Sequence, residues 1–307
     1  MDWTKATIDA GPSRNLMVVS PRVLIQDEVM AVRMRSLLTG ALGELRVHPV
    51  ARWIRATSGG QTVVSSTKAL LVWEPRRVVP SYAVPISDLQ GELVPATETS
   101  GVERPVQFSG GGPQVLTPSS SFSAHSCPGE VLSILTSTGA LEGAAFAPDD
   151  PALQDYVVLD WTAFDQWQEE EEVVMGHPHD PFGRIDVLRS SRHVVVSSKG
   201  AVLADSTRPT LLFETSLPTR YYLPRDDISW DLLTPSESHT VCAYKGVASY
   251  WTARLSDGDL PDIAWTYEEP LHDALKVQGM VAFFTERIDL VVDGTAVKRP
   301  VTPWSRA

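Results

Sequence analysis

The sequence places its densest group of chemically able side chains in the string FETSLPTRYYLPRDD, which begins at Phe213. If RYYLP is an extended strand, Arg220 and Tyr222 project from one face, while Tyr221 and Leu223 project from the other. A guanidinium beside an aromatic ring suits a carboxylate, a phosphate or a planar polar ligand.

Glu214 lies six residues before Arg220 and allows a second interpretation of the same string. The two side chains could form a buried ion pair that braces neighbouring strands and binds nothing. Both interpretations remain open.

A second group occupies CAYKGVASYW, from Cys242 to Trp251. Cys242, Tyr244 and Lys245 bring a thiol, a phenol and an amine to one strand end, and a nearby cation could favour a thiolate nucleophile. The alternative is a small buried cysteine that packs or lines a pocket. His239 precedes Cys242 by an odd number of residues, so on a strand the two side chains would face opposite ways.

The string HPHDPFGRID, which begins at His177, contains two histidines and two aspartates. It matches no standard metal-ligand spacing, so a metal and a structural role both stay open. In the structural interpretation, Asp180 and Asp186 bind backbone N–H groups or pair with Arg184 and Arg189.

Common enzyme motifs are absent from the sequence. It has no Walker loop, no dinucleotide-binding glycine motif, no G-x-S-x-G elbow and no H-E-x-x-H. We therefore expect no cofactor and no resident metal, and leave open whether the protein is an enzyme.

An internal repeat positions these groups. RWIRATSGGQTVVSSTKALLVWE, residues 52–74, aligns without a gap on RHVVVSSKGAVLADSTRPTLLFE, residues 192–214. After one slipped residue, YAVPISDL aligns with YYLPRDDI, and further on Cys127 falls near Cys242. A block that occurs twice indicates a tandem duplication and not a solenoid.

Within each copy the patterns are typical of antiparallel strands. Lys199-Gly200 predicts a tight hairpin turn, and an Asp-Gly turn follows IDLVV. One short helix is expected at Leu271 to Gln278 with Gly279 as its C-cap, and another at Val29 to Leu45, broken near Gly40. The sequence therefore predicts two compact, mainly β domains with short helices.

We expect four segments along the chain. They are a flexible lead-in at 1–14, a diverged first copy at 15–168, an acidic linker at 169–173 and a well-kept second copy at 174–304. SGGGPQVLTPSSSFS, residues 109–123, occurs only in the first copy and has the composition of a surface loop.

Charge and composition narrow the class of partner. The chain of 307 residues carries 26 basic and 38 acidic residues, and this net charge of −12 disfavours nucleic acid. No apolar run is long enough to span a bilayer, and the N-terminus does not resemble a secretory signal. We expect a cytoplasmic protein with no membrane contact, whose two cysteines are reduced.

The second copy resembles a known family, the Domain of Unknown Function 427. The resemblance covers Val174 to Trp304 and rests on RIDVLRSSRHVVV, STRPTLLFETSLPTRYYLPRDDI, CAYKGVASYW and VAFFTERIDLVVDG followed by RPVTPWS. The family's label has at times included "nucleotidyltransferase", although no nucleotide-binding motif accompanies it here. The first copy looks like a diverged member.

The resemblance implies a compact β domain similar to the β-tent or Mss4-like group, without the paired cysteines that hold zinc in many relatives. The motif positions that it implies are Glu214, Arg220, Tyr222, Cys242, Tyr244, Lys245, Gly246 and Trp251. In the first copy Glu74 and Cys127 remain, but Ala83 replaces Tyr222 and residues 128–130 replace the Lys-Gly pair. That copy is expected to have lost the site.

Three functional hypotheses follow. The first is a module that binds a small polar or anionic ligand in a cleft of the second domain, lined by Glu214, Arg220, Tyr222, Tyr244, Lys245 and Trp251. The second is a reductase or transferase that uses Cys242 or Lys245. The third is a protein-interaction module in which the two β domains pack as an intramolecular pseudo-dimer.

Overall fold

A computed structural model describes residues 31, 34–97, 105–107 and 113–305, and over these the chain is mainly β. All paired strands named below are antiparallel and the helices are short, which confirms the predicted fold class. The expected lead-in at 1–14 lies outside the described residues. α1 (Met34–Gly40) and the 3-10 turn η1 (Ala41–Gly43) form the helix predicted near Gly40. No helix in the described ranges is long and apolar enough to cross a membrane.

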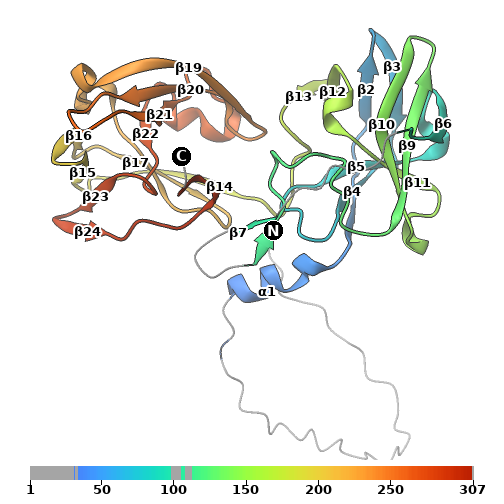
Figure 1. Ribbon diagram of the computed structural model, residues 1–307, viewed down its shortest axis with the longest axis horizontal. Helices are drawn as coiled ribbons and strands as arrows, with labels where there is room; N and C mark the ends of the chain where they lie inside the picture. The colour runs from blue at the N-terminus through green and yellow to red at the C-terminus, as the bar shows by residue number, and fades with distance from the viewer. Residues whose placement is uncertain (1–30, 32–33, 98–104, 108–112, 306–307) are drawn as a thin grey trace, which may run out of the picture.

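The first half, residues 46–174, contains a seven-stranded sheet (Figure 1). In spatial order its strands are β1 (Arg46–Pro49), β4 (Leu70–Trp73), β5 (Ser81–Pro85), β11 (Tyr156–Leu159), β10 (Gly139–Pro148), β9 (Gly129–Thr136) and β6 (Glu92–Pro95). A four-stranded sheet accompanies it, in the order β13 (Glu172–Val174), β12 (Gln166–Glu169), β2 (Ile54–Ser58) and β3 (Gln61–Ser66).

The remaining elements of the first half are short. β7 (Val106–Gln107) and β8 (Gln114–Val115) pair with each other, so the inserted tract expected as a loop contains a strand in its described part. The connecting 3-10 turns are η2 (Ile86–Asp88), η3 (Pro151–Leu153) and η4 (Trp161–Ala163).

The second half, residues 185–305, repeats this strand order. Its large layer runs β14 (Ile185–Arg189), β17 (Thr210–Glu214), β18 (Arg220–Tyr222), then β22 (Val281–Phe283), β21 (Leu260–Thr266), β20 (Gly246–Ala253) and β19 (Leu233–Cys242). A bridge between Leu223 and Val281 joins its two parts. The small sheet is β24 (Thr295–Val297), β23 (Asp289–Val292), β15 (Val194–Ser198) and β16 (Ala201–Ser206).

The two halves have the same strand register around Tyr82 of the first half and Tyr221 of the second. Leu71 pairs with Tyr82 in the first half, and Leu211 pairs with Tyr221 in the second. By the same register Ser81 stands where the second half has Arg220.

Tight turns close the hairpins of the small sheets. Lys199 and Gly200 both have positive φ, at 50° and 84°, as do Asp293 and Gly294, at 50° and 76°. These values fit two-residue turns whose twist matches the flanking strands, and they confirm both predicted turns.

Each half has two groups of buried side chains, one on each face of its large layer. In the second half, the core between the layers contains Val194, Leu223, Trp251 and Ile263. The opposite face holds a second cluster of buried residues, Val187, Leu212, Tyr222, Ala248, Trp265, Tyr267, Ala274, Val277 and Ala282. Ala274 and Val277 of this cluster belong to η7 (His272–Val277), a 3-10 helix at the place where a helix was predicted. Gly279 follows η7 with φ 66°. The other 3-10 turns are η5 (Arg225–Asp227), η6 (Trp230–Leu232) and η8 (Pro303–Ser305).

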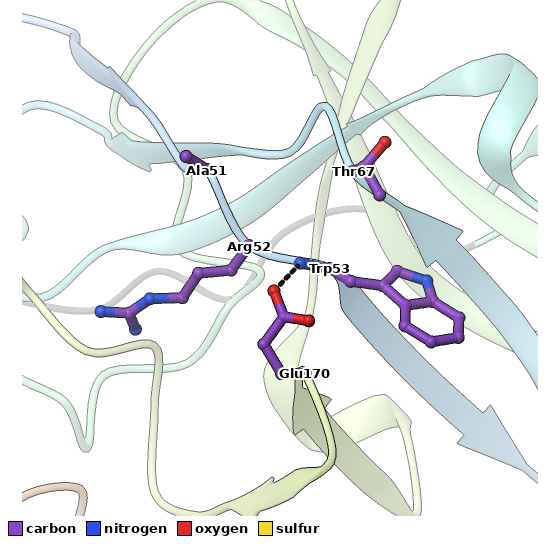
Figure 2. Close-up of a pocket in the computed structure, with 5 residues that line it drawn as sticks. All are labelled: Ala51, Arg52, Trp53, Thr67 and Glu170. Atoms are coloured by element: carbon purple, nitrogen blue, oxygen red, sulfur yellow. Dashed lines mark hydrogen bonds between the residues drawn. The ribbon is translucent and has the colours of Figure 1, made fainter.

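The acidic run at 169–173, expected as a solvated linker, is instead the turn of the β12–β13 hairpin. The Glu169 carboxylate is buried, where it pairs with Arg52 and accepts a hydrogen bond from the Tyr82 hydroxyl. Glu170 accepts a bond of 2.9 Å from the Trp53 N–H (Figure 2). A run of acidic residues predicts a solvated linker when its carboxylates have no partners in the folded chain. Here the partners of Glu169, Arg52 and Tyr82, lie more than 80 residues away in sequence.

One aromatic side chain from the segment between the halves reaches back to the first half. The Phe182 ring centroid lies 5.0 Å from that of His48 and 6.2 Å from that of Trp73. The string HPHDPFGRID therefore contacts both halves, because its histidine at 179 packs on the second.

Candidate functional site

Arg220 is held inside the second half by a carboxylate that the sequence did not single out. Its guanidinium donates to both oxygens of Glu286, at 2.7 and 2.8 Å, and lies over Trp265, Phe284 and Trp304 at 5.5–5.7 Å from each ring centroid. Only 7% of Arg220 is exposed. The alternative of a buried ion pair thus describes Arg220, but with Glu286 in place of Glu214.

Burial raises the pKa of Glu286, but the hydrogen bonds and charge of Arg220 outweigh this and hold the pKa below its ordinary value. Thr302 donates a further hydrogen bond of 2.8 Å to the same carboxylate. Both terminal nitrogens of Arg220 are therefore held by Glu286, which occupies the forked side that would otherwise bind an anion.

Tyr222 lies on the same face as Arg220 and is fully buried. Its hydroxyl oxygen accepts a hydrogen bond of 3.1 Å from the Trp265 indole, and burial raises its pKa to about 12. Tyr221 and Leu223 contact the core between the layers, which confirms the predicted alternation. Tyr222 therefore packs inside the buried cluster of this face and does not line a cleft.

Glu214 and Lys245 form a second ion pair on this face. The Lys245 ammonium donates to the Glu214 carboxylate at 2.6 Å, and their side chains are 10% and 18% exposed. Burial lowers the pKa of Lys245, but the charge of Glu214 more than offsets this, so the pKa is raised. Lys245 is therefore a cation at neutral pH, which makes it a poor nucleophile.

Three half-buried side chains lie on or against the turn next to this pair. The Tyr244 hydroxyl accepts the Asp180 N–H at 2.8 Å, and the His179 ring stacks on the Tyr244 ring at 5.2 Å. His177 lies near Glu214 and has a pKa lowered by burial. The segment that the sequence marked as a possible metal site thus packs against the turn that carries Lys245.

The histidines of that segment bond to the backbone. His177 bonds the Pro178 carbonyl at 2.8 Å and His179 bonds the Ala243 carbonyl at 2.7 Å. Asp180 accepts the Phe182 N–H, and Asp186 pairs with Arg184, as in the structural interpretation. Over the described residues, no three His, Cys, Asp or Glu side chains gather as metal ligands.

The two remaining predicted residues, Cys242 and Trp251, do not lie together. Cys242 is a free, partly exposed cysteine at the end of β19, within electrostatic reach of Lys245. Trp251 does not join the group, because residue 251 faces the core between the layers, where its ring contacts Trp230 at 5.5 Å. Trp251 is thus a core residue and the expectation that it lines the same cleft is corrected.

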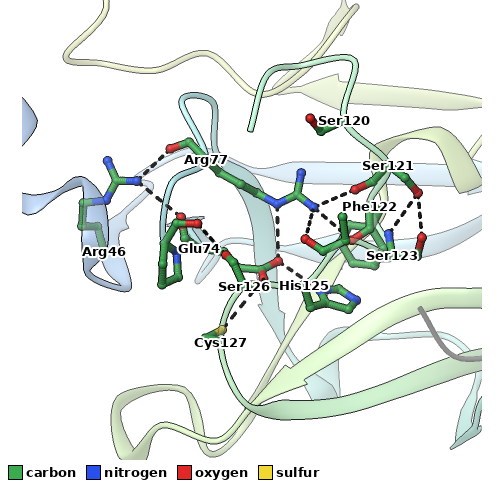
Figure 3. Close-up of polar contacts among 12 residues, drawn as sticks. Arg46, Glu74, Arg77, Ser120, Ser121, Phe122, Ser123, His125, Ser126 and Cys127 are labelled. Atoms are coloured by element: carbon green, nitrogen blue, oxygen red, sulfur yellow. Dashed lines mark hydrogen bonds and ion pairs between the residues drawn. The ribbon is translucent and has the colours of Figure 1, made fainter. Parts of the chain in front are cut away.

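The equivalent place in the first half holds a different cluster (Figure 3). The buried Glu74 carboxylate accepts the Ser126 N–H at 2.8 Å and bonds His125 at 3.1 Å, and Arg77 lies 3.6 Å from it. Burial and the charge of Glu74 raise the pKa of the neighbouring Cys127 to about 12. Sequence reasoning kept Glu74 and Cys127 but missed Arg77 and His125, because neither has a counterpart in the repeat.

Two surface depressions lie elsewhere, one in each half. The first, of about 510 Å³, is lined by Ala51, Arg52, Trp53, Thr67 and Glu170 (Figure 2). The second, of about 430 Å³, is lined by Arg189, Ser190, Ser191, Thr207, Arg208, Pro209, Thr210, Lys276 and Met280. Neither contains any of the six residues predicted to line a ligand cleft.

Comparison with known proteins is informative for the second half. Residues 186–294 match a family model. The family is described as Domain of unknown function (DUF427), the one that the sequence resembles, and the match covers β14 to the turn after β23. It includes Glu214, Arg220, Tyr222, Cys242, Tyr244 and Lys245. No curated protein matches the chain.

Proposed function

We propose that the second half is a module that binds a small polar ligand at the partly exposed edge of the Glu214–Lys245 pair. The observation that carries this proposal is the pair itself, a 2.6 Å contact between two side chains that are mostly removed from water. Such pairs contribute little net stability, because desolvation of both ions offsets their attraction. Clusters of ionisable groups at low exposure are more common at functional sites.

The chemistry of the pair indicates what such a ligand carries. Lys245 has three donors and uses one on Glu214, so the pair retains two further N–H groups and one further carboxylate oxygen with which it could bond a ligand. Because the two charges cancel, the ligand best matched is a neutral or zwitterionic molecule with adjacent donor and acceptor. Tyr244 supplies an aromatic edge beside it.

The first half is assigned a supporting role in this proposal. Its Glu74 is only 2% exposed and is surrounded by partners, so it offers no comparable edge. We also propose that the halves arose by duplication and pack together as a pseudo-dimer, which the shared strand order and the Phe182 contact support.

Native mass spectrometry of the whole chain with mixtures of neutral and zwitterionic metabolites tests the binding proposal. A true ligand should bind the parent and lose about tenfold or more in affinity when Lys245→Met and Glu214→Gln are combined, since this removes hydrogen bonds to charged groups. The double variant leaves no unpaired buried charge and should stay folded.

The matched control is Lys298→Gln, which removes an exposed ammonium outside the cluster. It should bind the ligand as the parent does. If every ligand found binds the double variant as tightly as the parent, the proposed site is wrong.

A thiol reaction at Cys242 is a second candidate, favoured by the free thiol near the Lys245 cation. Iodoacetamide labelling of Cys242 at pH 8 should then be slower in Lys245→Met, which removes that cation, than in the parent, and unchanged in Lys298→Gln. A labelling rate that is identical in the parent and in Lys245→Met would remove this candidate.

A further inference from the structure

The depression of the second half has a composition unlike that of the chain around it. It lies where β14 ends, beside the turn between β16 and β17 and under η7. Its lining contains three cations, Arg189, Arg208 and Lys276, and no acidic side chain. In a chain with a net charge of −12, this is a local concentration of positive charge.

Two of the three charges are not neutralised. Arg208 pairs with Asp227 at 2.7 Å. Lys276 bonds only the Val187 carbonyl, at 3.1 Å, which leaves its charge uncompensated. Within the described part of the chain, the exposed Arg189 guanidinium has no hydrogen-bond or ion-pair partner, although the sequence had offered Asp180 and Asp186 for it.

Hydroxyl groups complete the polar side of the depression. The Ser190 oxygen accepts the Arg192 N–H at 3.2 Å, so its own hydrogen remains free to donate. Ser191 and Thr207 are exposed, and their hydroxyls bond to no other described residue. A tetrahedral anion with several oxygens would accept from such donors as well as from the cations.

An apolar side and the size of the depression indicate more than a bare ion. Pro209 and Met280 line it, and its volume of about 430 Å³ lies within the range of sites for small organic ligands. A ligand with an anionic end and an apolar or neutral body would contact both sides.

The first half provides an internal contrast. Ala51 and Thr67 line its depression at the positions that Ser191 and Thr207 take in the second, but there Glu170 contributes a carboxylate. By the ungapped alignment of the repeat, Pro49 stands where the second half has Arg189. The two depressions thus share two lining positions, but the first has one arginine and one carboxylate, whereas the second has three cations and no carboxylate.

From this we infer that the depression of the second half binds a phosphorylated small molecule, with the phosphate between Arg189 and Lys276 and the organic part against Met280. Two uncompensated positive charges match a phosphate monoester, which carries nearly two negative charges at neutral pH. A guanidinium fork fits two phosphate oxygens, and the serine and threonine hydroxyls reach the rest. This site is separate from the Glu214–Lys245 pair, since it lies at the Arg189 end of β14 and the pair lies at the Ile185 end.

Titration calorimetry of the whole chain with pyrophosphate, at constant ionic strength, tests the inference. Arg189→Gln and Lys276→Gln should each weaken binding by about tenfold, the cost of one hydrogen bond to a charged group, and their combination should weaken it further. Both side chains are exposed, so neither substitution should impair folding.

Arg184→Gln is the matched control, because it removes an exposed arginine that directly precedes the other end of β14. It should bind pyrophosphate as the parent does. An equal loss in this control, or no loss in the Arg189→Gln and Lys276→Gln double variant, would overturn the site. Citrate binding as tightly as pyrophosphate would overturn the assignment to phosphate.

Discussion

Glu74 and Glu214 take the same place in two layers of identical strand order, yet their surroundings differ. Glu74 is enclosed by His125, Arg77 and the Ser126 N–H, whereas Glu214 has Lys245 as its ion-pair partner and keeps 18% of its side chain exposed. A carboxylate at this point of the fold must be neutralised in either case. The first half neutralises it in a site closed to solvent, whereas the second half neutralises it in a site that stays partly exposed.

The same contrast extends along the neighbouring strand. Where the second half has Arg220 and Tyr222, the first has Ser81 and Ala83. The missing ring is supplied from a loop, since His125 stacks on Phe146 with ring centroids 3.7 Å apart. The face that carries Arg220 and Tyr222 in the second half is thus packed differently in the first, and is not left as an empty space.

The largest expected effect separates the two halves at the Arg220 position. Arg220→Met should lower the free energy of unfolding by about 3–5 kcal/mol, because it leaves the buried Glu286 unpaired. The equivalent change in the first half, Ser81→Ala, should cost within about 0.5 kcal/mol. Urea denaturation measures both.

A second variant distinguishes the ion pair from simple packing. Arg220→Met combined with Glu286→Leu should recover much of the loss, because no unpaired charge remains buried. An equal loss in the single and double variants would show that the pair is not the cause.

Cys127 in the first half should react slowly with alkylating agents. At pH 8 a thiol with a pKa of about 12 is ionised about a thousandfold less than one at the ordinary value of 9.0, and the greater nucleophilicity of its thiolate recovers part of this. Iodoacetamide should therefore label Cys127 roughly fiftyfold more slowly than a free thiol at the ordinary value, as followed by peptide mass spectrometry.

Glu74→Gln sharpens this test, because it removes the charge that helps to raise the pKa of Cys127. Labelling of Cys127 should become faster while that of Cys242 stays unchanged. Unchanged labelling of Cys127 would mean that burial alone controls its pKa.

The smallest effect concerns acid. Because the folded pKa of Glu286 lies below its ordinary value of 4.5, its stabilisation is present above pH 4.5 and is lost as the pH falls through the folded pKa. The difference in stability between parent and Glu286→Gln should be constant from pH 7 to 5 and shrink towards pH 3. Urea midpoints across this range would measure it, and a constant difference would contradict the assignment.

Much of this architecture was readable from local patterns. The positive-φ turns at Lys199-Gly200 and Asp293-Gly294, the 3-10 helix before Gly279 and the alternation of RYYL all follow from residue preferences within a few positions. The ungapped repeat is matched by the register of Leu71 with Tyr82 and of Leu211 with Tyr221.

The partners of the charged residues could not be read in this way. Sequence distance favoured Glu214 for Arg220, but Glu286 lies 66 residues away on the connection that follows β22. Similarly, the acidic run at 169–173 was interpreted without Arg52 and Tyr82, which convert it into part of a sheet.

By itself the sequence determined that the protein is mainly β, and it showed that Arg220, Tyr222 and Lys245 of the second half have no counterparts in the aligned string of the first. Only the tertiary structure decided that Arg220 pairs with Glu286, that Trp251 faces the other side of its layer and that Arg189 and Lys276 line one depression without carboxylate partners. The physical reason is that backbone conformation depends on near neighbours, whereas the burial and neutralisation of a charge depend on groups that only folding brings together.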